Sequence, residues 1–278
     1  TYSASYRERG FEMPVTDYLR KRFMPHIWCP GCGNGTVLNS LLRAVENLGL
    51  DKNGIVMVTG IGCSARMEGY VDFHTLHTIH GRALAFATGV KLARPELKIL
   101  VPMGDGDALA IGGNHFIHAA RRNIDMTAVI LNNGIYGMTG GQNSPLTGLN
   151  KYATTAPYGT IDQAFDTVSL AEAAGASFVA RSTTYHVSHM VSVLQKAITH
   201  KGFSVVEVLT QCPTYYGRKN RMKSPAAMVE WYRDHTYQKG TKPKETEGEM
   251  IEIGIFVDEE RPEYCEEYQK IMDKVSAQ

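Results

Sequence analysis

The chain has 278 residues, a formal net charge of +1, 43% hydrophobic residues and 21% charged residues. This balance is ordinary for a globular protein and gives no bulk-charge argument for binding nucleic acid or a membrane surface. No apolar run approaches the length of about 18 residues that indicates a membrane-spanning helix, and the polar first segment is unlike a signal peptide. Five cysteines without such a signal favour a reducing compartment, so we expect a cytoplasmic protein.

Three parts are expected along the chain. Residues 1–24 form a polar N-terminal arm, residues 25–239 alternate between apolar and glycine-rich stretches, and residues 240–278 are rich in charge. Strand-like runs that alternate with helical patterns are typical of an α/β fold with a parallel sheet and helices on both faces. We therefore predict one α/β domain whose two arms pack on it or on another subunit.

Two cysteines open the α/β domain. Cys29 and Cys32 bracket a Pro-Gly pair ahead of a helical pattern over residues 36–48. Both sulfurs of such a knuckle can face one metal ion or cluster. A redox pair of the thioredoxin type is the alternative, but it needs a preceding strand, and none is evident.

Two more cysteines follow predicted strands. Cys63 comes after the strand at 55–59, and Cys212 comes after the strand at 205–209. Both should lie at the edge of the sheet where parallel strands end. Together with the first pair, four thiolates suit a [4Fe–4S] cluster or a structural Zn²⁺. The alternative is that Cys63 and Cys212 are small buried hydrophobic residues.

Histidines recur every three residues at positions 74, 77 and 80. This spacing drifts around a helix, so we interpret His74 and His77 as ordinary polar residues rather than metal ligands. His80 leads into a predicted helix over residues 83–92, and the start of that helix favours an anionic group.

The most informative stretch runs from residue 99 to residue 139. A short apolar run ends in Gly-Asp-Gly around Asp105, and a second apolar run ends in Asn-Asn at Asn133. Between them lies a helical pattern whose expected inner positions are Leu109, Phe116, Ile117 and Ala120. A strand-helix-strand crossover makes the strands parallel, so both turns lie at one edge of the sheet. Carboxylate and amide oxygens with nearby glycine amides suit a magnesium-bound diphosphate. Two unrelated turns are the alternative.

The remaining stretches complete the predicted elements. The glycine-rich residues 134–142 should form a loop on the ligand. A short helix over 166–174 and a strand over 178–181 precede a helix that Thr183 or Thr184 caps. Cys265 lies among glutamates in the charged tail, and we expect no role for it.

Taken together, these motifs resemble a known family. The Gly-Asp-Gly and Asn-Asn pair resembles the thiamine-diphosphate signature, and the whole set resembles the β subunit of 2-oxoacid:ferredoxin oxidoreductases, most closely the 2-oxoglutarate branch. The matching pieces, which cover most of residues 26–216, are Cys29-Pro30-Gly31-Cys32-Gly33, Gly60-Ile61-Gly62-Cys63-Ser64, His80-Gly81-Arg82, Gly104-Asp105-Gly106-Asp107, Asn132-Asn133 and Cys212-Pro213.

The resemblance implies roles for particular residues. Mg²⁺ would be held by Asp105, Asn133 and the main-chain carbonyl of Ile135. One [4Fe–4S] cluster would be held by Cys29, Cys32, Cys63 and Cys212. Contacts with thiamine diphosphate are implied for Ile61, Gly62, Cys63, Ser64, His80, Gly104, Asp105, Gly106, Asp107, Asn133, Ile135, Tyr136, Gly137, Met138 and Thr139.

Catalytic roles are expected for Ser64, His80 and Arg66. Arg66 follows Cys63-Ser64-Ala65 and would pair with the distal carboxylate of 2-oxoglutarate. A surface arginine, or one that serves a partner chain, is the alternative.

The resemblance also implies an activity and partners. The enzyme would carry out a reversible, coenzyme A-dependent oxidative decarboxylation of a 2-oxoacid, here 2-oxoglutarate to succinyl-CoA and CO₂, and pass electrons through the cluster to ferredoxin. An α subunit would supply the pyrimidine-binding domain, because the chain leaves no room for a second domain, and two αβ pairs would associate.

Two other classes stay open at this point. One is a non-redox thiamine-diphosphate lyase or decarboxylase subunit with a structural zinc. The other is a non-catalytic subunit that binds a nucleotide diphosphate.

Overall fold

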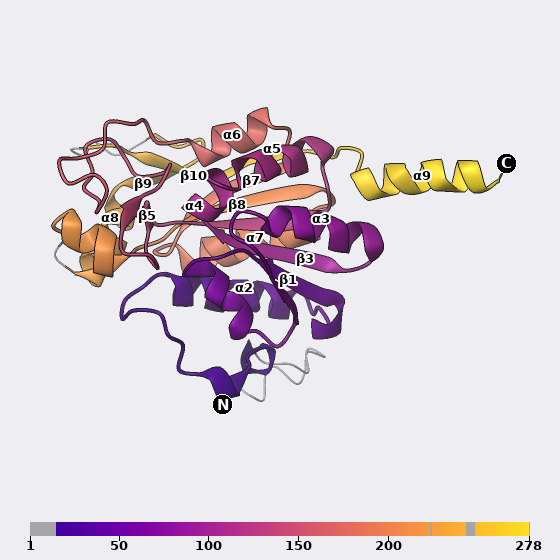
Figure 1. Ribbon diagram of the computed structural model, residues 1–278, viewed down its shortest axis with the longest axis horizontal. Coiled ribbons are helices and arrows are strands. Elements are labelled where there is room, and N and C mark those ends of the chain that lie inside the picture. Colours follow the sequence, from indigo (N-terminus) through magenta and orange to yellow (C-terminus); the bar gives the residue numbers. More distant parts are fainter. Residues whose placement is uncertain (1–14, 223, 243–247, 278) are drawn as a thin grey trace.

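A single sheet organises the molecule. The computed structural model describes residues 15–222, 224–242 and 248–277. The sheet contains β1 (Ile55–Thr59), β2 (His74–His77), β3 (Lys98–Gly104), β4 (Met126–Asn132), β7 (Phe178–Thr183), β8 (Phe203–Leu209), β9 (Thr236–Gln238) and β10 (Ile251–Asp258). Their order is β2-β1-β3-β4-β8-β7-β10-β9, and every neighbouring pair is parallel except β7 and β10 (Figure 1). The predicted parallel α/β sheet is therefore confirmed.

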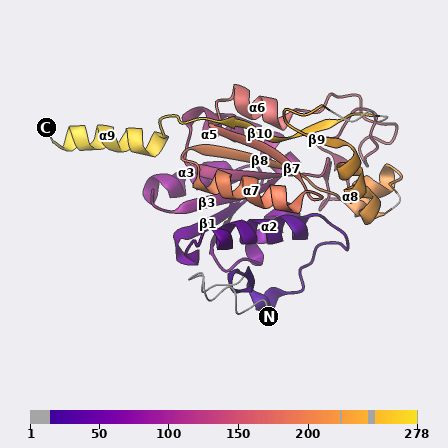
Figure 2. The same ribbon diagram turned by 180° about the vertical axis from the view of Figure 1, so that it is seen from behind.

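Helices cover both faces of this sheet. The α-helices are α2 (Asn34–Asn47), α3 (Ala83–Ala93), α4 (Asp105–Leu109), α5 (Gly113–Arg122), α6 (Thr167–Ala173), α7 (Val187–Thr199), α8 (Pro225–Asp234) and α9 (Tyr264–Ser276). Helices α3, α5 and α6 lie in front of the sheet in Figure 1, whereas α2 and α7 lie in front in the reverse view of Figure 2. Helix α9 extends away from the body of the molecule in both views.

Shorter elements join these parts. They are η1 (Val15–Tyr18), η2 (Lys21–Phe23), η3 (Lys52–Gly54), η4 (Ser64–Gly69), η5 (Pro213–Gly217) and a two-stranded ribbon of β5 (Ile135–Tyr136) and β6 (Gln142–Asn143). Within the described ranges, no helix combines the length and the apolar character needed to cross a bilayer.

The core consists of two apolar layers, one on each face of the sheet. Successive side chains of a strand point to opposite faces, so Ile55 and Met57 of β1 pack with α2 and α7, while Val56 and Val58 pack with α3 and α5. Because both faces are buried, the central strands consist almost entirely of apolar residues.

The sequence prediction for the central stretch was wrong in detail. The single helix expected after Gly-Asp-Gly is two helices, α4 and α5, with Gly112 as the cap before α5. The break rotates α5, so Ile117 is 40% exposed, whereas Leu109, Phe116 and Ala120 are buried as predicted. Histidines 74 and 77 lie on strand β2, which forms an edge of the sheet, and not on a helix.

The last third of the chain differs in two further places. The residue that caps α7 is His186, while Thr183 Oγ1 accepts hydrogen bonds from the amides of Tyr185 and His186 just before it. The tail predicted as an arm from residue 240 contributes β10 to the sheet, so the sheet continues beyond residue 239. Residues 1–14 of the N-terminal arm lie outside the described residues.

Candidate active site

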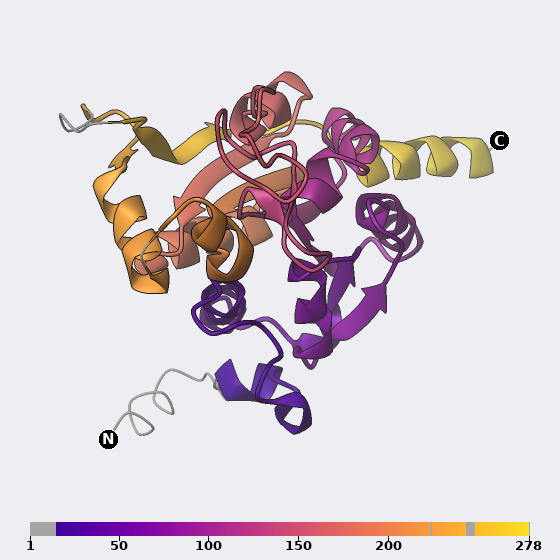
Figure 3. The same cartoon turned by 60° about the vertical axis from the view of Figure 1, so that its left-hand side comes forward.

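Four neighbouring parallel strands end at one edge of the sheet. There β1 leads into residues 60–63, β3 into α4, β4 into residues 133–139, and β8 into residues 210–213. Figure 3 turns the loops after β4 and helix α8 toward the viewer. Crevices at this edge are the usual ligand sites of open α/β sheets.

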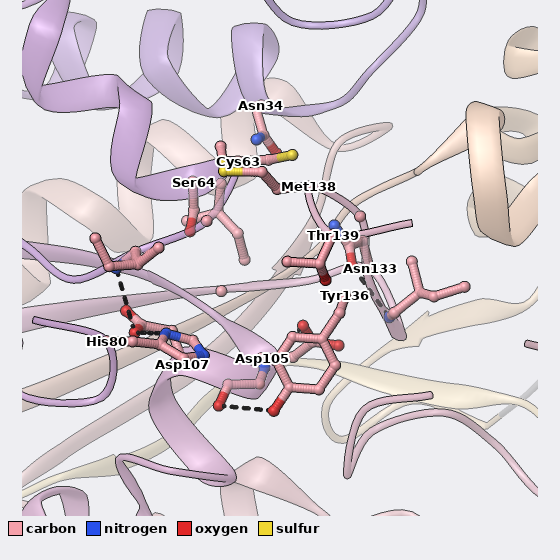
Figure 4. A pocket seen from close by; sticks show the side chains of 17 residues that line it. Asn34, Cys63, Ser64, His80, Asp105, Asp107, Asn133, Tyr136, Met138 and Thr139 are labelled. Atoms are coloured by element: carbon pink, nitrogen blue, oxygen red, sulfur yellow. Dashed lines mark hydrogen bonds and ion pairs between the residues drawn. The ribbon is translucent and has the colours of Figure 1, made fainter. Parts of the chain in front are cut away.

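The turns surround a pocket that opens to solvent. Every residue predicted to contact thiamine diphosphate lines it, together with Asn34 and Leu131 (Figure 4). The structure thus brings the whole predicted set around one hollow. The contacts that each side chain makes with a cofactor stay predictions.

Asp105 is a buried, hydrogen-bonded side chain of the pocket. It is 3% exposed, its Oδ2 accepts from the Ser144 hydroxyl at 2.6 Å, and its Oδ1 accepts from the Gly106 amide at 2.9 Å. Burial raises the pKa of Asp105 to about 6, and these hydrogen bonds oppose the rise. A divalent cation would keep such a desolvated carboxylate ionised, which makes Asp105 a good candidate metal ligand.

The turn after β4 lies against Asp105. The amides of Gly134 and Ile135 donate toward the Asp105 carboxylate and help to lower its pKa. The same amides also donate to the turn's own asparagines, Gly134 to Asn132 Oδ1 and Ile135 to Asn133 Oδ1, both at 3.1 Å. Two of the residues predicted to bind Mg²⁺, Asn133 and Ile135, therefore lie on a turn fixed by its own side chains, and this turn contacts the third, Asp105.

A buried glutamate supports this turn from inside the sheet. Glu207 of β8 is 2% exposed, and its Oε1 accepts from Asn132 Nδ2 at 2.8 Å and from Thr167 Oγ1 at 2.7 Å. Its Oε2 accepts from Arg181 Nε at 2.5 Å, and that pairing compensates the buried charge. Glu207 thus fixes the residue next to Asn133.

His80 is fixed by Asp107 on the β1 side of the pocket. Asp107 Oδ1 lies 2.6 Å from His80 Nδ1 and accepts from the Gly81 amide at 2.7 Å. Burial raises the pKa of Asp107, whereas these hydrogen bonds lower it. A Cβ at Gly60 would lie 2.4 Å from Asp107 Oδ2, so this close approach requires glycine. Because Nδ1 is engaged, Nε2 is the ring nitrogen of His80 available to a ligand.

Four buried polar atoms of the pocket have no hydrogen-bond partner among the described residues. They are Asp107 Oδ2, Ser64 Oγ, and both Nδ2 and Oδ1 of Asn34. Buried polar atoms of this kind are usually satisfied by a ligand or by water. They mark places where a bound group can accept or donate hydrogen bonds.

The loops that carry the four predicted cluster cysteines are tied together. Gln211, next to Cys212, donates from Nε2 to the Gly31 carbonyl at 3.1 Å and accepts at its own carbonyl from the Gly33 amide at 3.1 Å. Trp28 Nε1 donates to the Cys63 carbonyl at 2.7 Å. The knuckle at residues 29–33 is thereby joined to both of the other cysteine loops.

The sulfur atoms also converge. A Cβ at Gly137 would lie 3.6 Å from Cys63 Sγ and 3.7 Å from Cys212 Sγ, so both sulfurs meet the pocket at this glycine. Burial raises the pKa of Cys32 to about 12 and that of Cys63 to about 11, and the charges of the neighbouring cysteines add to both shifts. Thiols in this state ionise when a cationic metal centre is present.

The described part of the chain contains no group of three or more His, Cys, Asp or Glu side chains that could hold a single metal ion.

Two predicted residues lie apart from this group. Arg66 is exposed on η4 and is not part of the lining of the pocket, so its catalytic role stays a prediction. Cys265 is buried at the start of α9, and it lines a different hollow with Lys91 and Asp125.

Sequence reasoning missed three contributors: Asn34, Ser144 and Glu207. The sequence contains a signal for Glu207, because it is the one charged residue in the apolar strand β8. It contains no such signal for Ser144 or Asn34, since neither has a distinctive spacing from the motifs.

Comparison with known proteins agrees with this geometry. Residues 60–208 match the family model "Thiamine pyrophosphate enzyme, C-terminal TPP binding domain". The chain is 49% identical over 269 residues to the 2-oxoglutarate synthase subunit KorB of Methanothermobacter thermautotrophicus, covering 95% of this chain and 94% of that one. It is 51% identical over 255 residues to the KorB subunit of Archaeoglobus fulgidus, covering 92% and 93% of the two chains.

A solved structure is similar over nearly the whole chain. It is the 2-oxoglutarate:ferredoxin oxidoreductase of Magnetococcus marinus with 2-oxoglutarate, coenzyme A and succinyl-CoA bound. The TM-score is 0.85 at 34% sequence identity, and the match covers 95% of this chain and 91% of that chain. The chain therefore belongs to the thiamine pyrophosphate enzymes and, among them, to the β subunits of the 2-oxoacid:ferredoxin oxidoreductases.

Proposed function

We propose that this chain forms the half of a 2-oxoglutarate:ferredoxin oxidoreductase that binds the diphosphate of thiamine diphosphate and the iron–sulfur cluster. The enzyme converts 2-oxoglutarate and coenzyme A to succinyl-CoA and CO₂ and passes two electrons, one at a time, to ferredoxin. One observation carries the proposal: Asp105 and Cys63 line the same pocket. A diphosphate anchor and a cluster ligand in one hollow are what an oxidative decarboxylase needs, because electrons must leave the cofactor.

Asp105, Asn133 and the Ile135 carbonyl hold Mg²⁺ in this proposal. Their oxygen donors suit a hard cation that keeps phosphate oxygens in its coordination shell. The positive φ of Gly134, +67°, allows the tight turn that brings these donors together. Main-chain amides of the Gly-Asp-Gly turn would supply further hydrogen-bond donors to the diphosphate.

Thiamine diphosphate, when bound, supplies the electron sink that lets CO₂ leave the 2-oxoacid. This chain's residues position it. His80, fixed through Nδ1 on Asp107, presents Nε2 to the pocket, and the unpartnered Ser64 hydroxyl provides a second polar group.

The four cysteines 29, 32, 63 and 212 hold one [4Fe–4S] cluster in this proposal. Each thiolate of such a cluster binds a different iron, so the sulfurs stand farther apart than the ligands of a single ion. Relatives named as 2-oxoglutarate synthase and 2-oxoacid:ferredoxin oxidoreductase subunits favour a redox enzyme. A non-redox lyase or decarboxylase with structural zinc is not favoured.

An α subunit completes the enzyme, as the β-subunit family implies. Exposed apolar side chains on the loop after β6 support a partner surface there: Leu149, Tyr152, Tyr158, Ile161 and Phe165, of which Tyr158 is 95% exposed. We also propose ferredoxin as electron acceptor, coenzyme A as acyl acceptor, a dimer of αβ heterodimers, and a location in the cytoplasm.

The test is anaerobic reconstitution with iron, sulfide, Mg²⁺ and thiamine diphosphate, followed by 2-oxoacid-dependent reduction of a viologen dye. The αβ complex should reduce the dye faster with 2-oxoglutarate than with pyruvate and should require coenzyme A. This chain alone should bind the diphosphate weakly and turn over no substrate. A colourless αβ complex without iron, or full turnover by the isolated chain, would contradict the proposal.

A further inference from the structure

One buried side chain of the pocket has no place in the proposed function. Asn34 is 1% exposed and lines the pocket, yet neither its Nδ2 nor its Oδ1 has a hydrogen-bond partner among the described residues. An amide buried with both polar atoms unsatisfied is costly, so a native structure normally satisfies it with a ligand.

The position of Asn34 indicates which ligand. It is the first residue of α2, directly after the knuckle that carries Cys29 and Cys32. Its main-chain amide already donates to the Cys32 sulfur and lowers the pKa of that thiol. In Figure 4, Asn34 and Cys63 lie at one end of the pocket, and Asp105 and His80 lie at the other.

The distribution of charge around the pocket also favours a ligand at the cysteine end. Four thiolates and their cluster would carry net negative charge, but no Lys or Arg is among the described residues that line the pocket. Mg²⁺ offsets the diphosphate at the Asp105 end. At the cysteine end, the pocket lining offers neutral donors, and the N-terminal end of α2 contributes partial positive charge.

We propose that Asn34 Nδ2 donates a hydrogen bond to a sulfur atom of the cluster held by Cys29, Cys32, Cys63 and Cys212. The reduced cluster carries one more negative charge than the oxidised cluster, so the donor stabilises the reduced form more and raises the reduction potential. Asn34 is thus a tuning residue for the step in which the cluster takes one electron from the cofactor and passes it on. The inference rests on the proposed cluster.

The experiment uses the anaerobically reconstituted αβ complex and measures the cluster midpoint potential by EPR-monitored redox titration. Iron content and thiamine-diphosphate affinity are measured on the same samples. Asn34→Leu removes the donor at similar volume, and Asn34→Asp replaces it with a negative charge of the same shape. Ser40→Ala is the matched control, because Ser40 is buried on the same helix with an unpartnered hydroxyl but does not line the pocket.

Both Asn34 variants should keep their iron and show a lower midpoint potential, with the larger shift in Asn34→Asp. Ser40→Ala should leave the potential unchanged. An unchanged midpoint potential in an iron-loaded Asn34→Asp complex would overturn the inference. Loss of iron from both Asn34 variants would also overturn it, because Asn34 would then be necessary for cluster assembly. Weaker thiamine-diphosphate binding at an unchanged potential would assign the amide to the cofactor instead. If the wild-type complex holds no cluster, the proposed function itself fails.

Discussion

The two ends of the pocket differ in how far the protein satisfies its own polar groups. At one end, both carboxylate oxygens of Asp105 accept hydrogen bonds from the chain, although Asp107 Oδ2 nearby has no partner among the described residues. At the other end, neither polar atom of the Asn34 amide has such a partner, and burial raises the pKa of the Cys32 thiol to about 12. The fold therefore preorganises Asp105, whereas the proposed cluster would complete the cysteine end.

The largest effect should come from the preorganised end. Asp105→Ala should weaken Mg²⁺-dependent binding of thiamine diphosphate by more than about 100-fold, since even outer-shell partners of metal sites contribute 10–100-fold. Thiamine content after gel filtration measures this loss. Asp162→Ala is the control, because Asp162 is exposed and does not line the pocket. Stoichiometric cofactor in the Asp105 variant would remove the central argument for the site.

At the cysteine end, Cys63→Ser or Cys212→Ser should remove the cluster while the diphosphate still binds. Each change deletes one thiolate from a set of four, and the hard hydroxyl of serine is a poor substitute for iron–sulfur ligation. Iron analysis and the absorption spectrum of anaerobic protein measure the loss. Cys265→Ser is the matched control and should keep both iron and turnover. Dependence of iron content on Cys265 rather than Cys212 would show that the ligand set is wrong.

A smaller effect is expected one contact away from the metal. Glu207→Gln should weaken thiamine-diphosphate binding about 10-fold, the lower range for an outer-shell change at a metal site. It should also lower the free energy of unfolding by about 2 kcal/mol, because Arg181 loses a charge-assisted hydrogen bond to Glu207 and keeps its ion pair with Asp166. Calorimetric titration and thermal unfolding measure the two effects, with the exposed Glu260→Gln as control. Lower stability with unchanged cofactor affinity would restrict Glu207 to a structural role.

The parts of the molecule also differ in how well the sequence predicted them. The diphosphate end depends on short motifs at the carboxyl ends of strands, and strand β1 has the bounds that its apolar run predicted. The local break that separates α4 from α5, and with it the exposure of Ile117, depends on Gly112 packing against carbonyls of residues 107 and 108. Hydrophobic spacing alone carries no such information.

Polar contacts between residues far apart in the sequence were the second feature that the sequence could not predict. Glu207 and Asn132 are 75 residues apart, and Gln211 and Gly31 are 180 residues apart. Strand β2 was missed because His74 and His77 give it neither an apolar run nor strict alternation. A strand at the edge of the sheet needs neither an apolar run nor strict alternation, and β2 is such an edge strand.

The smallest expected effect concerns a residue outside both ends. Arg66 is exposed on η4 and does not line the pocket, so it can meet the distal carboxylate of 2-oxoglutarate only at the pocket's mouth or through the α subunit. An exposed ion pair contributes at most about 1 kcal/mol, which corresponds to about a fivefold change in KM. Arg66→Ala should therefore raise KM for 2-oxoglutarate by about that factor and leave KM for pyruvate unchanged. Steady-state assays of the αβ complex with both substrates measure this, and Arg43→Ala on the far end of α2 is the control. Equal changes for the two substrates would assign Arg66 to the subunit interface, because an interface residue affects turnover without distinguishing a dicarboxylic from a monocarboxylic substrate.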